Sequence, residues 1–181
     1  LHSADYLWVP SEWQKQMLIT NGIASNKISV VHEGIDPKKY YPIKRNNDKL
    51  TFLHIGTWGY RKSSYEIIKT FLDVFGNNDD VELRISINNK LDYQEGPIET
   101  FKKFGLPLNK NIKILGTLSE DEYTTEIQNA DLYISCSRGE GWNLPLIQSI
   151  ASGVPSIYSK CGGQLEFTKN DLGIGIDILG E

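Results

Sequence analysis

The chain has 181 residues, of which 39% are hydrophobic and 10% aromatic, and its formal net charge is −4 at pH 7. This length and composition are typical of one globular domain, and the acidic balance argues against a nucleic-acid-binding surface. No hydrophobic run approaches the roughly 20 residues of a membrane span, and no secretory leader is visible. Two cysteines make no disulfide framework. We therefore expect a cytoplasmic protein in which Cys136 and Cys161 are reduced.

The first fifty residues predict two short strands around one helix. Residues 4–10 form the first expected strand, and Ser11 with Gln14 then has the spacing of a capping box that opens a helix. Residues 27–32 form the second strand, and the charged run 44–49 marks a domain boundary. Because the chain begins with leucine in the middle of this pattern, we expect it to be a fragment.

From residue 51 onward, hydrophobic strands alternate with amphipathic helices. The predicted strands are 51–55, 81–87, 112–115, 132–136, 155–158 and 173–179, and the predicted helices are 63–76, a part of 95–104, 119–129 and 145–153. This alternation is typical of an α/β fold with a doubly wound parallel sheet. Ligands of such sheets bind beyond the carboxyl ends of the strands, so the loops that follow the strands are expected to carry the site.

The loop and helix after the fourth of these strands carry the strongest indication of a binding site. Glu140 lies between two glycines, and Pro145 and Gly153 have the positions that favour the start and the end of a helix. The free N–H groups and the dipole at a helix N-terminus bind anions. Amides beside a carboxylate suit a ligand that carries both phosphate and sugar hydroxyls.

The same stretch resembles the donor-site signature of a known enzyme family. Residues 140–148 read Glu-Gly-Trp-Asn-Leu-Pro-Leu-Ile-Gln, and Ala-Ser-Gly-Val-Pro at 151–155 and Gly-Gly-Gln-Leu-Glu at 162–166 follow. This pattern is similar to that of the retaining GT-B glycosyltransferases of the glycosyltransferase family 4 type. In the family motif seven residues separate a first Glu from a second, and Gln148 stands where that second Glu is expected.

The resemblance implies a fold, a domain organisation and a reaction. Residues 45–181 would be the nucleotide-sugar donor-binding domain, a Rossmann-like half of a GT-B fold, and residues 1–44 the end of the acceptor domain with the crossing segment. The reaction would be transfer of a sugar from a UDP- or GDP-linked donor with retention of anomeric configuration, without a metal or another cofactor. No Cys/His group has metal-ligand spacing, which agrees with that expectation.

The resemblance also implies roles for individual residues. In the family an arginine and a lysine in the loop after the first strand clamp the donor diphosphate. Lys62 matches the lysine, whereas Thr57 stands at the arginine position and Arg61 is the candidate substitute. Glu140 matches the glutamate that contacts the donor sugar, so Glu140, Lys62 and Arg61 are the expected catalytic residues. The other expected donor-binding residues are Gly56, Thr57, Thr117, Leu118, Gly141, Asn143, Leu144, Gln148 and Glu166.

Two alternatives and several partners follow from the same comparison. The departures at Thr57 and Gln148 are compatible with a non-catalytic sugar-nucleotide-binding domain whose site has drifted. A GT-B-fold sugar-nucleotide epimerase fits residues 140–148 less well.

The acceptor would be a glycan, a lipid-linked molecule or a small molecule. It would bind through an N-terminal domain that this chain lacks, so we expect the fragment alone to be inactive. A peripheral membrane contact through that missing domain is compatible with a cytoplasmic location.

Overall fold

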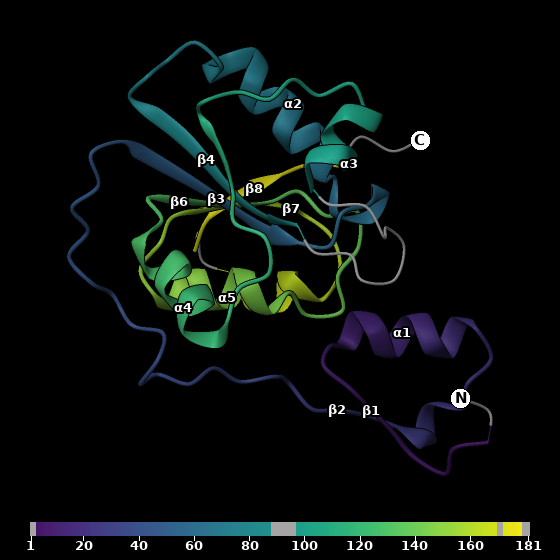
Figure 1. The fold of residues 1–181 in the computed structure, drawn as a ribbon. Coiled ribbons are helices and arrows are strands. Elements are labelled where there is room, and N and C mark those ends of the chain that lie inside the picture. The colour runs from purple at the N-terminus through teal and green to yellow at the C-terminus, as the bar shows by residue number, and fades with distance from the viewer. Residues whose placement is uncertain (1–2, 88–96, 170–171, 179–181) are drawn as a thin grey trace.

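The computed structural model describes residues 3–87, 97–169 and 172–178, which form two units (Figure 1). The small N-terminal unit contains β1 (Leu7–Val9), α1 (Glu12–Thr20), a 3-10 turn at Ser25–Lys27 and β2 (Ile28–Val30). Its two strands pair in parallel, and Val9, Ile23 and Ile28 form a hydrophobic cluster of their own. A long extended segment then leads to the larger unit along the outside of the molecule (Figure 1).

The larger unit is a six-stranded parallel sheet with helices on both faces. Its strands are β3 (Leu50–Gly56), β4 (Val81–Ile87), β5 (Ile112–Ile114), β6 (Leu132–Ser135), β7 (Ser156–Ser159) and β8 (Ile174–Ile176). Its helices are α2 (Ser64–Phe75), α3 (Pro97–Lys103), α4 (Glu120–Asn129) and α5 (Leu144–Ala151). The spatial order β5-β4-β3-β6-β7-β8 is the doubly wound order, which confirms the α/β prediction. Residues 95 and 96, in the predicted region of α3, and residue 179, in that of β8, lie outside the described residues.

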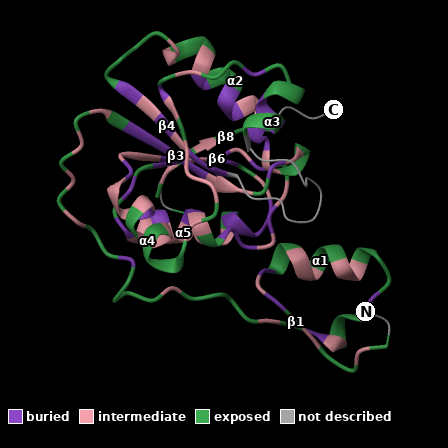
Figure 2. Cartoon of the chain, viewed as in Figure 1, coloured by how far each residue is buried: buried purple, intermediate pink, exposed green. Residues whose placement is uncertain are grey.

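Two hydrophobic clusters hold the helices to the sheet. Helices α2 and α3 cover one face of the sheet and α4 and α5 the other (Figure 1), and buried residues run along β3 and β4 (Figure 2). Neighbouring residues of a strand point to opposite faces, so Phe52 packs with Ile68 of α2 while Leu53 packs with Leu146 of α5. Strands covered on both faces are expected to be hydrophobic along their length, and β3 follows this expectation except at the buried Thr51 and His54.

Three helix starts differ from the sequence prediction in detail. The predicted box at Ser11 is half formed, since the Ser11 hydroxyl accepts the Gln14 amide but the Gln14 side chain lies beside Gly141 instead. Ser63 precedes α2 in the left-handed conformation (φ 52°) and its side chain makes no capping bond, because a 3-10 turn leads into the helix. Helix α5 begins at Leu144, one residue before the predicted first position.

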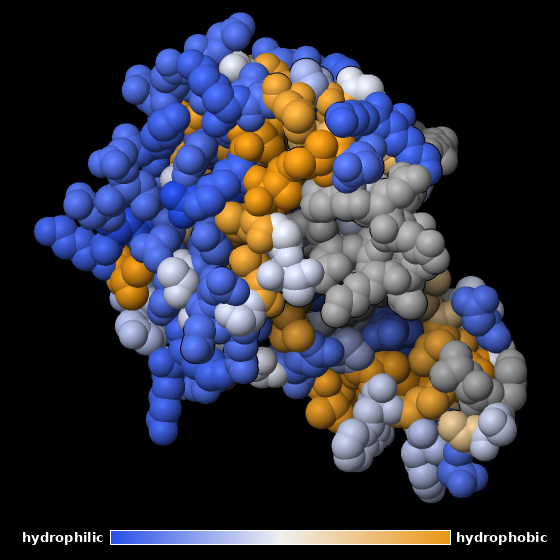
Figure 3. Space-filling view, viewed as in Figure 1, coloured by the Kyte–Doolittle hydropathy of each residue, from blue (hydrophilic) through white to orange (hydrophobic). Residues whose placement is uncertain are grey.

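Hydrophobic side chains reach the surface of both units. In Figure 3, hydrophilic side chains cover much of the larger unit around a band of hydrophobic ones, and further hydrophobic side chains lie on the N-terminal unit. In that small unit Tyr6 and Trp8 are almost fully exposed. Across the described ranges, every helix is too short or too polar to cross a membrane. Cys136 and Cys161 are free, as predicted, and burial raises the pKa of Cys136 to about 11.

His54 links the elements around the centre of the sheet. It lies in β3 with 1% of its surface exposed, and its Nδ1 is 2.9 Å from the carbonyl oxygen of Ile134 in β6. A carbonyl only accepts, so Nδ1 carries the proton and Nε2 accepts the Ser64 hydroxyl of α2 at 3.2 Å. Burial, with a smaller contribution from the nearby Lys62, lowers the pKa of His54 to about 4.

We predict that His54 makes the protein sensitive to mild acid. The unfolded state takes up a proton near pH 6.5 and the folded state near pH 4, so stability is complete above pH 6.5 and falls between these values. The difference corresponds to about 3 kcal/mol at pH 4. Lowering the pH from 7 to 4 should therefore reduce the free energy of unfolding of the wild type more than that of His54→Asn, as measured by urea unfolding. The asparagine amide keeps a hydrogen-bond donor near the position of Nδ1. Equal pH dependence of the two proteins would contradict this role of His54.

Candidate functional site

The strand order places one crevice at the centre of the sheet. The chain leaves β3 toward β4 on one side, and it leaves β6 toward β7 on the other side. Because β3 and β6 are neighbours, the loops that follow them diverge, and a crevice between such loops is the usual ligand site of a doubly wound sheet. The first loop carries Arg61 and Lys62, and the second carries Glu140.

These three side chains meet in one cluster. The ammonium of Lys62 donates to Oε1 of Glu140 at 2.6 Å, and Nη1 of Arg61 donates to the same oxygen at 2.9 Å. The side chains of Glu140 and Lys62 are only 9% and 12% exposed, whereas that of Arg61 is 55% exposed. Two cations around one carboxylate give the cluster a formal charge of +1 within an acidic protein. The cluster therefore has the charge to hold an anion.

Two glycines hold the backbone of Glu140 in place. The Gly163 amide donates to the Glu140 carbonyl oxygen at 2.8 Å, and Gly162 has a φ of +72°. A Cβ at Gly162 would lie closer than 3.0 Å to that same oxygen, and a Cβ at Gly163 would clash with the carbonyl of Gly141. Only glycine allows the two loops to approach so closely.

The start of α5 is fixed by buried amide side chains. Asn143 precedes the helix with φ 78°, and its Nδ2 donates to Ser135 Oγ at 2.9 Å and to Gln164 Oε1 at 2.5 Å. The amides of the next turn donate back to the Asn143 carbonyl. Among the described residues, the N–H groups of Asn143 and Leu144 have no protein partner. They are the amides of this helix that are available to a ligand.

The other predicted residues lie in different surroundings. Gly56 ends β3 beneath the aliphatic part of the Lys62 side chain, and Thr57 is exposed. Thr117 and Leu118 follow β5, at the edge of the sheet. The roles of these four residues and of Gly141 toward a donor stay predictions.

Gln148 and Glu166 already have protein partners. Oε1 of Gln148 accepts the Tyr123 hydroxyl at 2.6 Å. Glu166 accepts the Glu12 amide at 2.7 Å, at the start of α1, and its other oxygen is 2.9 Å from Nε2 of His32. Both side chains connect elements of this chain, and their predicted contacts with a donor stay untested.

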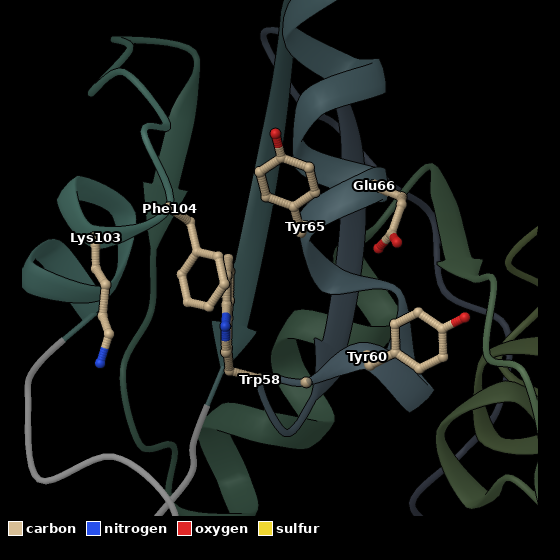
Figure 4. Close-up of a pocket in the computed structure, with 7 residues that line it drawn as sticks. Trp58, Tyr60, Tyr65, Glu66, Lys103 and Phe104 are labelled. Carbon is tan, nitrogen blue, oxygen red and sulfur yellow. The ribbon is translucent and has the colours of Figure 1, made fainter.

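Sequence reasoning gave no role to Arg138, which contacts the loop of Arg61 and Lys62. Its guanidinium lies over the Tyr60 ring, 3.7 Å from the ring centroid, and its Nη2 is 3.0 Å from Glu66. Beside this loop is a cavity of about 560 Å³ with mostly aromatic walls (Figure 4). Its lining residues are Trp58, Gly59, Tyr60, Tyr65, Glu66, Lys103 and Phe104. A cation directly before Gly139 and Glu140 was the sequence signal for Arg138.

Comparison with known proteins gives one family and several relatives. The model of the family "Glycosyl transferases group 1" matches residues 38–177. The sulfoquinovosyl transferase SQD2 of Arabidopsis thaliana is 25% identical over 173 residues, which are 89% of this chain and 32% of the relative. The alpha-monoglucosyldiacylglycerol synthase of Streptococcus pneumoniae is 26% identical over 174 residues, 87% of this chain and 38% of the relative. The chain thus spans about a third of the length of these curated relatives.

Solved structures agree with the fold. The crystal structure of HepE from Anabaena in complex with UDP-glucose superimposes with a TM-score of 0.76 at 16% identity. The match covers 96% of this chain and 50% of HepE. The sucrose-phosphate synthase of Thermosynechococcus elongatus matches with a TM-score of 0.71 at 21% identity, over 98% of this chain and 46% of that protein.

We predict that Gly162 is required for the geometry of Glu140. In Gly162→Ala, the left-handed φ and the clash with the Glu140 carbonyl should together lower the free energy of unfolding by about 2 kcal/mol or more. Gly139→Ala is the matched control, because a Cβ there meets nothing within 4 Å and φ is not left-handed. It should stay within about 0.5 kcal/mol of the wild type in urea unfolding. Equal stability of the two variants would show that the close contact between Gly162 and the Glu140 carbonyl does not require glycine.

Proposed function

This chain belongs to the glycosyl transferases group 1 family, and we propose that it is the donor-binding half of a retaining, metal-independent enzyme of the glycosyltransferase family 4 type. The enzyme transfers a sugar from a nucleotide-diphosphate sugar to an acceptor. The observation that carries this proposal is the cluster of Arg61, Lys62 and Glu140 at the crevice between β3 and β6. The UDP-glucose held by HepE supports a nucleotide sugar as the donor, UDP- or GDP-linked.

The cations and the helix amides would stabilise the leaving group. Negative charge develops on the departing diphosphate as the bond to the sugar breaks. Donors that are already in place for that charge lower the barrier without having to reorganise. Lys62 and Arg61 supply two cations from one loop, and the free N–H groups of Asn143 and Leu144 supply neutral donors from the other.

Glu140 would change partners when the donor binds. In the free chain its carboxylate accepts from both Lys62 and Arg61. A diphosphate offers these cations oxygen acceptors with more charge, which releases carboxylate lone pairs for sugar hydroxyls. Glu140 would thus keep the two cations in place before the donor binds and would orient the sugar afterwards.

The acceptor would meet the donor from a second domain. The chain spans about a third of its curated relatives, and correct orientation of two reactants supplies several kcal/mol of a typical barrier. We therefore expect residues 1–181 to bind the donor without transferring sugar to a glycan, a lipid-linked or a small-molecule acceptor.

One observation favours the alternative of a non-catalytic binding domain. Gln148 stands where the family has a glutamate, and its oxygen is already engaged by Tyr123. Turnover of a nucleotide sugar by the full-length protein supports the enzyme, whereas nucleotide binding without turnover supports the alternative.

We predict that Lys62→Ala weakens binding of UDP or GDP by about ten- to a hundredfold, because it removes a charge-assisted contact worth about 1.5–3 kcal/mol. Isothermal titration calorimetry with each nucleotide measures the change. Lys69→Ala is the control, since Lys69 also belongs to the region of α2 and has an ion-pair partner, Asp73, but lies on the exposed face. Unchanged affinity in Lys62→Ala would remove the diphosphate site from the proposal.

We predict opposite effects of Glu140→Gln on the two parts of a donor. The neutral amide releases Lys62 and Arg61, so UDP alone should bind about threefold more tightly. The sugar loses a charged acceptor, so the affinity of UDP-glucose relative to UDP should fall by about fivefold. Calorimetry with both ligands gives this ratio, and Glu120→Gln, which alters an exposed ion pair with Lys39, is the control. A ratio equal to that of the wild type would mean that Glu140 does not contact the sugar.

A further inference from the structure

The two cations of the site lie on a short turn that needs support. Arg61 and Lys62 belong to a three-residue 3-10 turn, Tyr60–Lys62, which connects β3 to α2. The turn ends at Ser63, whose left-handed φ of 52° is a strained conformation for a residue other than glycine. The side chains of Tyr60 and Arg61 are largely exposed, so burial contributes little to holding this turn.

Arg138 of the opposite loop contacts the turn at Tyr60 and Arg61, and it contacts Ser63, which follows the turn. Nη1 donates to the Tyr60 carbonyl at 2.5 Å and to the Ser63 hydroxyl at 2.9 Å. The Arg138 amide donates to the Arg61 carbonyl at 2.8 Å. The guanidinium also covers one face of the Tyr60 ring, as a cation–π contact.

The charge and the planar shape of the Arg138 guanidinium suit it to supporting the Tyr60–Lys62 turn. Glu66, in the first turn of α2, accepts from Nη2 at 3.0 Å and balances its charge. Figure 4 shows Tyr60 and Glu66 on the same side of the aromatic cavity, at the start of α2. A planar fork donates to several acceptors and stacks on a ring at the same time, which the single ammonium of lysine does not.

We propose that Arg138 is a positioning residue, which holds the Tyr60–Lys62 turn so that Arg61 and Lys62 meet the diphosphate. The inference rests on the proposed function of that site. Arg138 lies two residues before Glu140, so one short loop positions both the carboxylate and the cations. The role is indirect, because the guanidinium bonds the Tyr60 carbonyl in the turn and the Ser63 hydroxyl directly after it.

The first test is a double-mutant cycle on nucleotide affinity. Arg138→Ala should weaken UDP or GDP binding by about five- to tenfold in calorimetry, and Arg138→Lys should not restore it. In the Lys62→Ala background, Arg138→Ala should reduce the nucleotide affinity by a clearly smaller factor, because a residue that acts through Lys62 is energetically coupled to it. Equal losses in both backgrounds would overturn the positioning role. Lys69→Ala, combined with Arg138→Ala, serves as the additive control.

The second test needs no ligand. The amides of Lys62 and Ser63 donate within the turn, to Gly59 and Tyr60, and Arg138→Ala should increase their hydrogen exchange. The amides of α4, on the other face of the sheet, should exchange as in the wild type. Unchanged exchange at Lys62 and Ser63 in Arg138→Ala and Arg138→Lys would refute the proposal. If the wild type binds neither UDP nor GDP, the proposed function fails, while the exchange still decides whether Arg138 holds the turn.

Discussion

The ion pairs between Glu140 and its two cations join the two loops on which the candidate site depends. Lys62 and Arg61 come from the loop after β3, and Glu140 comes from the loop after β6, 78 residues from Lys62. The two strands are neighbours at the point where the strand order reverses. Together with the contacts of Arg138, these ion pairs bridge that point, so two cations and a carboxylate are collected in a crevice that the sheet topology creates.

The surroundings of the cluster limit its charge and its motion. His54 lies close to Lys62 and stays neutral, because burial lowers its pKa, and so it adds no third positive charge below the site. Gly162 and Gly163 bring a third loop onto Glu140, and Arg138 supports the turn of the cations. The site is therefore preorganised by contacts between loops, which is the condition for electrostatic stabilisation of a leaving group.

The N-terminal unit is attached close to this site. Glu166 accepts amides at the start of α1, and His32 stacks on Trp142 with the ring centroids 4.9 Å apart. Gln14 of α1 lies beside Gly141, which follows Glu140. A movement of this unit would change the packing on the loop that carries Glu140. The contacts give the N-terminal segment a direct mechanical connection to the candidate site.

The sequence by itself determined the fold class, the order of the elements and the loops that carry Lys62, Arg61 and Glu140. These features depend on local patterns, such as hydrophobic periodicity and the capping box that Ser119 and Glu122 form at the start of α4. The tertiary structure alone decided the partners of Glu166, Gln148 and Arg138, which lie up to 154 residues away in the chain. A carboxylate, an amide or a guanidinium has the same bonding capacity in any loop. Which acceptor or donor it meets depends on how the sheet brings distant loops together.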